Sequence, residues 1–433
     1  MQQNPVGCLV PRTMEWRRRC LRPRVLGIAL LSVGIILSLL AFHKTEVTYV
    51  KKVQPPLREL LYRPLNFDDV TAARHQTDNV SQHLGCVDAE GVEKVQDILC
   101  MKRPDYLTRY KNPCWVDWTV DLQMLRCLPY FHILGVDKCG TTDLHSRIAQ
   151  HPHVLLNSGG LGKETYYWCW LKYGQWMKKT VTPKPFSYYL KLFQKPAATI
   201  AENPDPQGFH PLITGDGTPM DFWDFRAWPL IPQNRGLKEP VVLTPHLMKH
   251  MYRDPKFIVI LRNPVDRLYS DYIFLGYGFT PEKFRTDVPK AVDMMEKCLE
   301  VNTTRQCVFS NDTYVNLPMR IHLGMYSVFM KEWLAVFPRS SFYILRTEDY
   351  HDNMTYHLNN IYTFLELDPL PEETLQDILE ADRKHETKMK KKVHDMFPDT
   401  RELLQSFYSR YNQELAVMLD DAGFLWPEQD APS

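Results

Sequence analysis

The sequence has almost no net charge, since 52 Lys and Arg face 51 Asp and Glu over 433 residues, a formal balance of +1. This balance gives no indication of a nucleic-acid partner, and any binding of a polyanion must depend on local patches. The sequence also has no His, Cys and Asp cluster at the spacing of metal ligands, so we expect no metal. From about Cys86 to Pro427 it has no internal repeat and no long linker, which favours one globular domain.

Residues 25–42 contain no charged residue at all. As a helix this run would cover roughly 27 Å, close to the thickness of a bilayer core. Six arginines and one glutamate precede it, so the positive-inside rule predicts a cytosolic tail at residues 1–24 and a lumenal body. A cleaved signal peptide is the alternative, but the run is long for one and no A-x-A-type site follows. We therefore expect a single transmembrane signal-anchor helix.

The remaining sequence agrees with a lumenal location. Eight of the ten cysteines follow residue 42, an even number that suits an oxidising compartment. The N-x-[ST] glycosylation sequons stand at Asn79, Asn302, Asn311 and Asn353. Spacing favours a local disulfide between Cys298 and Cys307, and the further candidate pairs are Cys86 with Cys100 and Cys114 with Cys127. Sequence alone does not give the connectivity.

Composition divides the chain into a membrane-proximal part and a catalytic part. Residues 43–80 are polar and proline-punctuated, which is typical of a stem. Residues 81–427 form the expected catalytic domain, and 428–433 a tail.

Short apolar runs alternate with helical patterns in the catalytic part, which predicts an α/β fold. Runs that are apolar on both faces suit a buried, mainly parallel sheet with helices on both faces. The runs are Phe131–Leu134, Val154–Leu156, Leu212–Thr214, Phe257–Leu261 and Phe342–Leu345. One helix is expected to begin after Asn263 and Pro264, an N-cap and N1 pair. Another is expected from Asp399 to about Asp421, stopped by Gly423.

The segment from Gly135 to Thr142 is expected to bind an anion. It follows an apolar run and precedes an amphipathic pattern, so it predicts a strand, a loop and a helix N-terminus. The unpaired N–H groups and the dipole of a helix N-terminus favour negative charge. In a nucleoside-triphosphatase loop the lysine follows the second glycine, whereas Lys138 precedes Gly140. A triphosphatase is therefore disfavoured.

A second anion site is expected at Arg262. A hydrophobic strand delivers Arg262 to its carboxyl end, and Ser270 lies about two turns into the next helix. Arginine offers a planar fork of donors that suits phosphate. Two such strand ends on one sheet imply a ligand with two separate phosphate-like groups.

The two motifs, G-x-x-K-x-G-T-T-x-L and R-N-P-x-x-R-x-x-S, resemble those of the sulfotransferases that use 3′-phosphoadenosine-5′-phosphosulfate (PAPS). In that family the first loop holds the 5′-phosphosulfate, and the arginine and serine hold the 3′-phosphate. The resemblance implies a P-loop-like sulfotransferase fold and PAPS as co-substrate. Carried over by position, it assigns PAPS binding to Lys138, Cys139, Gly140, Thr141, Thr142, Arg262 and Ser270.

Lys163-Glu164-Thr-Tyr166-Tyr167-Trp168 resembles a segment of glycosaminoglycan sulfotransferases in which the glutamate is the candidate general base. The resemblance therefore implies two catalytic residues, Lys138 and Glu164. Asp216 is the alternative base, because it is also expected at a strand end. The aromatic residues after Glu164 are open to two interpretations, a sugar-stacking wall or a core.

Other segments, such as Asn112-Pro-Cys114-Trp115, resemble the Golgi group of N-acetylgalactosamine 4-sulfate 6-O-sulfotransferases. This resemblance implies sulfation of a glycosaminoglycan, at the 6-position of N-acetylgalactosamine 4-sulfate in chondroitin or dermatan sulfate. The alternatives are a sulfotransferase for a heparan-type glycan and an inactive glycan-binding protein on the same fold. The expected partners are the glycosaminoglycan acceptor and, through residues 25–42, the Golgi membrane. A homodimer is left open.

Overall fold

The structure is a computed structural model that describes residues 85–88, 95–118, 124–176, 179–381 and 394–427. All of them belong to one compact unit, Asn66–Ser433. The predicted cytosolic tail, transmembrane segment and stem lie outside the described residues, and so does the tail at 428–433. The predicted domain boundaries therefore stay predictions.

A five-stranded sheet forms the centre of the unit, and every neighbouring pair of strands in it is parallel. Its order is β4-β7-β3-β8-β9. The strands are β3 (Phe131–Gly135), β4 (Val154–Leu155), β7 (Ile213–Asp216), β8 (Lys256–Leu261) and β9 (Phe342–Arg346). Each corresponds to one of the five predicted runs, with small shifts at the ends, so the predicted parallel sheet is confirmed.

The central strands are buried along almost their whole length, as runs apolar on both faces require. All residues of β3 are buried, and in β8 only Lys256 is partly exposed. Strand β7 packs so closely on β3 that a Cβ atom at Gly215 would lie 2.3 Å from the Phe131 ring. Glycine is therefore required at position 215.

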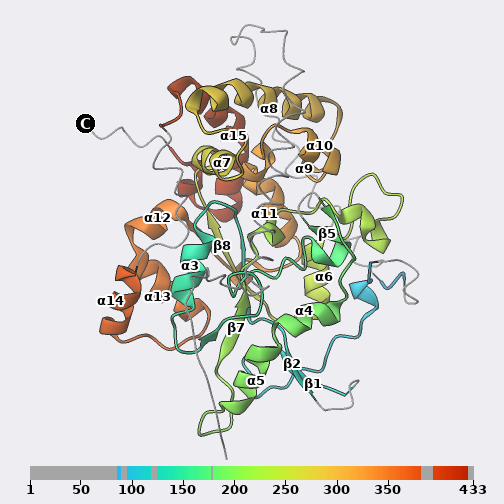
Figure 1. Ribbon diagram of the computed structural model, residues 1–433, viewed down its shortest axis with the longest axis vertical. Coiled ribbons are helices and arrows are strands. Elements are labelled where there is room, and N and C mark those ends of the chain that lie inside the picture. Colours follow the sequence, from blue (N-terminus) through green and yellow to red (C-terminus); the bar gives the residue numbers. More distant parts are fainter. Residues whose placement is uncertain (1–84, 89–94, 119–123, 177–178, 382–393, 428–433) are drawn as a thin grey trace, which may run out of the picture. The chain divides into compact units, whose positions relative to one another are not determined.

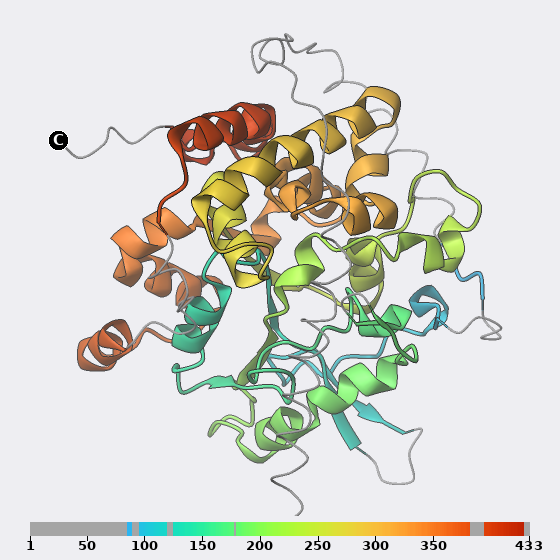
Figure 2. The ribbon, with the colours of Figure 1, turned by 45° about the horizontal axis from the view of Figure 1, so that its top comes forward.

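Helices lie on both sides of this sheet, as the sequence predicts. In Figure 1, α3 and α12 to α14 lie to the left of the central strands, and α4, α6 and α11 to the right. The helices are α3 (Thr141–Ile148), α4 (Phe186–Leu192), α5 (Gln194–Glu202), α6 (Thr244–Met251), α7 (Pro264–Phe274), α8 (Pro281–Val301), α9 (Thr304–Val308), α10 (Asn311–Asn316), α11 (Tyr326–Leu334), α12 (Thr347–Asp352), α13 (Met354–Phe364), α14 (Glu372–Glu380) and α15 (Pro398–Leu419). The short 3-10 helices are η2 (Ile98–Cys100), η3 (Leu171–Tyr173), η4 (Pro219–Phe222), η5 (Trp228–Leu230), η6 (Pro232–Asn234), η7 (Ile321–Gly324), η8 (Arg339–Ser341) and η10 (Ala422–Leu425). Both views show α15 beside α7 and α8, at the end of the unit away from α4 and α5 (Figure 2).

The two helices predicted in detail are both present. Asn263 caps α7, because its side chain accepts a hydrogen bond from the N–H of Val265 at 3.0 Å, with Pro264 at the first helical position. Helix α15 ends earlier than predicted, at Leu419. Asp420 takes the left-handed conformation there, with φ 54°, so the predicted stop at Gly423 is wrong. Aspartate tolerates this conformation better than most residues do, so the helix can end there without a glycine.

Two small hairpins complete the described fold. Strands β1 (Cys114–Asp117) and β2 (Met124–Cys127) pair antiparallel, and so do β5 (Gln175–Trp176) and β6 (Lys179–Thr180). The disulfides are Cys86–Cys100, Cys114–Cys127 and Cys298–Cys307, as the sequence analysis suggested. The sequon residues Asn302, Asn311 and Asn353 are exposed, whereas Asn79 lies outside the described residues.

The fold prediction included a transmembrane helix, and on this point it is corrected. Among the residues that the structure describes, none of the helices combines the length and the apolar character that crossing a bilayer requires. The predicted span at residues 25–42 is not among the described residues.

Candidate functional site

The predicted site residues meet at one edge of the sheet, because the carboxyl ends of parallel strands all point the same way. Strand β3 ends at the loop that contains Lys138, β8 leads to Arg262, and β7 ends at Asp216. A hydrogen bond joins the first two of these strand ends, since Nη1 of Arg262 donates to the carbonyl oxygen of Lys138 at 3.4 Å. The sheet thus brings together two segments that are far apart in the sequence.

The loop between β3 and α3 exposes backbone donors at the start of a helix. Lys138 and Gly140 both take left-handed conformations, with φ 67° and 94°. This conformation is uncommon for lysine, and such strain is characteristic of functional sites. No side chain caps the amino end of α3, which begins at Thr141. Its first N–H groups and its dipole are therefore suited to an anion.

Residues from α12 and α11 hold this loop. The Thr347 hydroxyl lies 2.7 Å from the carbonyl oxygen of Cys139 and 3.0 Å from that of Leu261. The Tyr326 hydroxyl donates to the carbonyl oxygen of Arg262 at 2.9 Å. These contacts hold the two predicted anion-binding segments in register. Cys139 itself is fully buried, and burial raises the pKa of its thiol to about 12.

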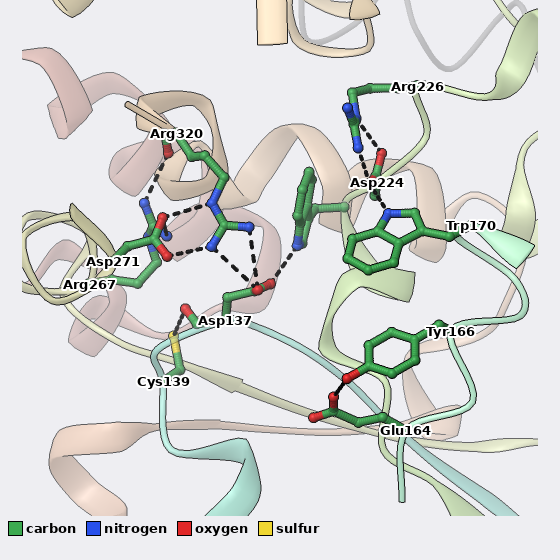
Figure 3. A network of polar contacts seen from close by, with 11 residues as sticks. Asp137, Cys139, Glu164, Tyr166, Trp170, Asp224, Arg226, Arg267, Asp271 and Arg320 are labelled. Carbon is green, nitrogen blue, oxygen red and sulfur yellow. Dashed lines mark hydrogen bonds and ion pairs between the residues drawn. The ribbon is translucent and has the colours of Figure 1, made fainter. Parts of the chain in front are cut away.

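A buried charge network holds the inner side of the loop (Figure 3). Asp137, the neighbour of Lys138, accepts a hydrogen bond from the indole of Trp223 at 2.7 Å and lies 3.4 Å from Arg320. Arg320 also pairs with Asp271, the neighbour of Ser270 on α7, and its Nε donates to that carboxylate at 2.9 Å. Arg320 therefore connects the Lys138 loop to the helix that contains Ser270.

The charges of this network are balanced. Arg267 lies 3.3 Å from Asp271 as a second partner. Burial alone would raise the pKa of Asp271, but the charges of Arg320 and Arg267 hold it below its usual range. Asp271 is thus an ionised carboxylate fixed between two arginines, and it anchors α7 directly beside Ser270.

The Lys138 side chain reaches α7. Its ammonium nitrogen lies 3.8 Å from the ring centroid of Phe274, within the range of a cation–π contact. Burial lowers the pKa of Lys138, and the carboxylates of Asp271 and Asp137 oppose that effect. Ser270, 6% exposed, lies on the same helix one turn before Phe274. Lys138, Arg262 and Ser270 are thus brought to a single region.

Glu164 is held by its immediate neighbours in the sequence. The Lys163 ammonium and the Tyr166 hydroxyl both donate to its carboxylate, and Figure 3 shows the tyrosine contact. Lys163 is almost fully buried and also donates to the carbonyl oxygen of Gly217 at 3.1 Å. Tyr166 takes a left-handed conformation, with φ 53°, as Lys138 does in its own loop. An oriented carboxylate of this kind can accept a proton.

The Glu164 segment lies beside the first turns of α3. Gly217 separates His145 of α3 from Lys163, since a Cβ atom at this position would lie 3.3 Å from the first and 3.4 Å from the second. Burial lowers the pKa of His145 to about 3, and the Lys163 ammonium adds to that effect. His145 is therefore neutral at ordinary pH and only a weak base.

Asp216, the alternative base, is enclosed by hydroxyl groups. It accepts hydrogen bonds from Thr165 at 2.6 Å, Thr218 at 2.7 Å and Tyr189 at 3.1 Å. Only 1% of the residue is exposed, and burial raises its pKa to about 6. The Asp216 carboxylate thus connects the end of β7 to Thr165, the residue after Glu164.

The aromatic residues after Glu164 divide into two groups. Tyr167 and Trp168 are completely buried and belong to the core. Tyr166 is partly exposed, and its ring stacks on Trp170 with centroids 5.4 Å apart. Trp170 donates in turn to Asp224 at 2.7 Å, and Asp224 directly follows the Trp223 that holds Asp137. The segment 223–224 therefore contacts both halves of the site.

The sequence analysis missed the residues that hold the site together, namely Asp137, Trp223, Arg320 and Thr347. Asp137 stands inside the recognised loop motif, and its position beside Lys138 was the one available signal. The other three residues lie far from the motifs, and only the fold brings them close.

The described residues offer no complete metal site. Their one group of Cys, His and acidic residues with ligand atoms close together is Cys86, Asp97 and Cys100, and its two cysteines form a disulfide. The Lys138 ammonium, the Arg262 guanidinium and the first N–H groups of α3 are hydrogen-bond donors that suit an organic phosphate with two anionic ends.

The chain is similar to known sulfotransferases in sequence and in structure. The sulfotransferase domain model matches residues 129–410. Carbohydrate sulfotransferase 15 of Mus musculus is 33% identical over 312 residues, covering 70% of this chain and 55% of that protein, and the Homo sapiens protein is 32% identical. The chain thus spans about half the length of these curated relatives. Among solved structures, a sulfotransferase from Alicyclobacillus acidocaldarius matches with a TM-score of 0.44 and 19% identity, covering 68% of this chain and 97% of that one.

Proposed function

The chain belongs to the sulfotransferase domain family, and from this premise we propose that it transfers a sulfuryl group from PAPS to a carbohydrate hydroxyl. The observation that carries the proposal is the contact between the Lys138 loop and Arg262 at neighbouring strand ends. Lys138 and the first N–H groups of α3 would bind the 5′-phosphosulfate, with Cys139, Gly140, Thr141 and Thr142 forming the loop. Arg262 and Ser270 would bind the 3′-phosphate.

The proposed reaction needs one base and one cation. The acceptor oxygen attacks sulfur, a new S–O bond forms, and the bond from sulfur to the bridging phosphate oxygen breaks. Adenosine 3′,5′-bisphosphate leaves with the electron pair, and the Lys138 ammonium stabilises the charge that grows on the bridging oxygen. Glu164 takes the proton of the attacking hydroxyl.

Glu164 is proposed as the base in preference to Asp216. The Glu164 side chain is 11% exposed, whereas Asp216 is buried and uses its oxygens for three hydroxyl groups. A base must come within hydrogen-bond reach of the acceptor hydroxyl, and the Glu164 carboxylate is the more accessible of the two.

For the acceptor, we propose the 6-position of N-acetylgalactosamine 4-sulfate in chondroitin or dermatan sulfate. The support is the resemblance of the motifs to that group of enzymes, together with relatives that are named carbohydrate sulfotransferase 15. The three disulfides support a place in an oxidising compartment, such as the Golgi lumen.

The test is an assay of the full chain with sulfur-labelled PAPS and a panel of chondroitin, dermatan, heparan and keratan acceptors, followed by disaccharide analysis. We expect label on 4-sulfated N-acetylgalactosamine at the 6-position. Label on heparan alone would mean that the acceptor is a heparan-type glycan and not chondroitin or dermatan sulfate. Binding of glycans without transfer to any of them would favour an inactive glycan-binding protein, and a calorimetric titration without binding of adenosine 3′,5′-bisphosphate would contradict the whole proposal.

A further inference from the structure

Acidic residues are absent from a long stretch directly after Glu164. Between Glu164 and Glu202 the sequence contains six lysines and neither aspartate nor glutamate. The chain as a whole carries nearly equal numbers of acidic and basic residues. Positive charge is therefore concentrated on the surface that this stretch forms.

The last part of the stretch folds into α4 and α5, which follow one another with only Phe193 between them. Their buried side is formed by Phe186, Tyr189, Phe193, Ala197 and Ile200. Lys191 in the last turn of α4 and Lys195 in the first turn of α5 are exposed to water, and Lys184, two residues before α4, is half-buried.

We call Lys184, Lys191 and Lys195 the lysine stripe. The Lys184 ammonium lies 5.7 Å from the ring centroid of Tyr188 on α4, so it belongs to the same part of the surface. The stripe thus places three positive charges on the segment that α4 and α5 form.

The charges of the stripe are not neutralised within the described part of the chain, where no salt bridge joins them to a carboxylate. Lysines elsewhere behave differently, since Lys290 and Lys297 on α8 lie 3.1 and 2.8 Å from Asp287 and Asp293. A bound polyanion would supply the negative charge that faces these lysines.

The stripe leads to the segment that contains Glu164. The N–H of Ser158 donates to the carbonyl oxygen of Leu192, the last residue of α4, at 2.9 Å. Two residues further, the N–H of Gly160 donates to the carbonyl oxygen of Glu164 at 2.8 Å. The end of α4 is therefore in direct contact with the loop that holds the proposed base.

We propose that the lysine stripe is the docking surface for a linear sulfated glycan, which it directs toward Glu164. This proposal rests on the function proposed above and adds the place and the chemistry of acceptor binding. Positive charges spread over neighbouring elements match a chain with repeated anionic groups better than they match a single compact anion. The interaction is electrostatic, so it must weaken as salt is added.

The test uses the full chain and purified chondroitin 4-sulfate oligosaccharides, with hyaluronan as the unsulfated probe. Binding is measured by calorimetry for the wild type and for the double variant Lys191→Ala/Lys195→Ala. We expect Kd for the sulfated probe to rise roughly tenfold at low salt, and the difference to vanish near about 0.5 M salt, where the screening length is a few ångströms. Hyaluronan is expected to bind more weakly than the sulfated probe to the wild type.

The matched control is Lys290→Ala/Lys297→Ala, which removes the same charge from α8. It is expected to keep the wild-type Kd, and both variants are expected to bind adenosine 3′,5′-bisphosphate as the wild type does. Equal losses in both variants, or no loss in the stripe variant, would overturn the proposal. So would a wild type that binds no sulfated glycan. Stripe-dependent binding without any transfer of sulfate would instead keep the docking surface and reject the proposed function.

Discussion

The Lys138 loop and the Glu164 segment lie at the same edge of the sheet but are held in different ways. Asp137 in the Lys138 loop is fixed by Trp223 and Arg320, which lie 86 and 183 residues away in the sequence. The Glu164 carboxylate is fixed by Lys163 and Tyr166, which lie one and two residues away. One half of the site thus depends on the tertiary fold, and the other on a local turn.

This difference has consequences for energetics. Arg320 and Asp271 are almost completely buried, and breaking a buried ion pair by removing one partner is strongly destabilising. The Tyr166 hydroxyl donates to the partly buried carboxylate of Glu164, so its loss should mainly affect the chemistry at Glu164. Changes around Lys138 should therefore affect stability and chemistry together, and changes around Glu164 chemistry alone.

The largest effect is expected for Lys138→Ala. Without the ammonium that is proposed to face the bridging oxygen, kcat should fall by about 10³-fold, the size seen when a preorganised donor is removed. Steady-state kinetics with labelled PAPS gives the measurement, and Lys297→Ala, which removes an exposed lysine, is the matched control. A loss below tenfold would remove Lys138 from the proposed mechanism.

Arg320→Met tests whether the Lys138 half of the site depends on the tertiary fold, because it should lower the free energy of unfolding. It leaves Asp271 buried with one partner fewer, so the free energy of unfolding should fall by about 3–5 kcal/mol at pH 7. The pKa of Asp271 is held below its usual range, so its contribution to stability is present at neutral pH and is lost as pH falls through that depressed value. The deficit of the variant should accordingly shrink in acid. Denaturant unfolding at pH 7 and at about pH 3, below the ordinary pKa of an aspartate, measures both effects.

The control for this variant is Arg253→Met, which removes an exposed ion pair with Asp254. Exposed pairs contribute about 0–1 kcal/mol, so this change should be nearly neutral. Equal destabilisation by the two variants would mean that the charge network does not hold the Lys138 loop.

Tyr166→Phe tests the local half. The variant removes one hydroxyl that donates to Glu164 and so orients the proposed base, and kcat should fall roughly tenfold, a part of the ~10²–10⁴-fold that a positioned base contributes. The melting temperature and the affinity for adenosine 3′,5′-bisphosphate should stay at wild-type values. If nucleotide affinity fell as much as kcat, the two halves would not be independent.

The smallest effect is expected for Phe274→Leu. The ring is 59% exposed and lies against the Lys138 ammonium, and an exposed cation–π contact contributes about 0.5–1 kcal/mol, so kcat should fall roughly two- to fivefold. Phe274→Tyr keeps the aromatic face and should behave as the wild type. Identical kinetics for the leucine and tyrosine variants would show that the contact has no role.

The same difference explains what the sequence could predict. The five strands and the caps of α7 follow from local patterns, and so did the Lys138 loop and Glu164 as candidates. Arg320 and Trp223 carry no local signature, because an arginine or a tryptophan becomes part of a site only when the sheet and α7 are assembled. The end of α15 was missed because Asp420 adopts a conformation usually reserved for glycine. None of the described helices is long and apolar enough to be the predicted transmembrane helix.

The most direct test of the account is transfer of labelled sulfate from PAPS to chondroitin 4-sulfate by Glu164→Gln, measured beside calorimetric binding of adenosine 3′,5′-bisphosphate. Loss of a general base should lower kcat by about 10²-fold or more while the nucleotide still binds with wild-type affinity. Near-wild-type turnover by Glu164→Gln would contradict the account, because the proton would then have another acceptor.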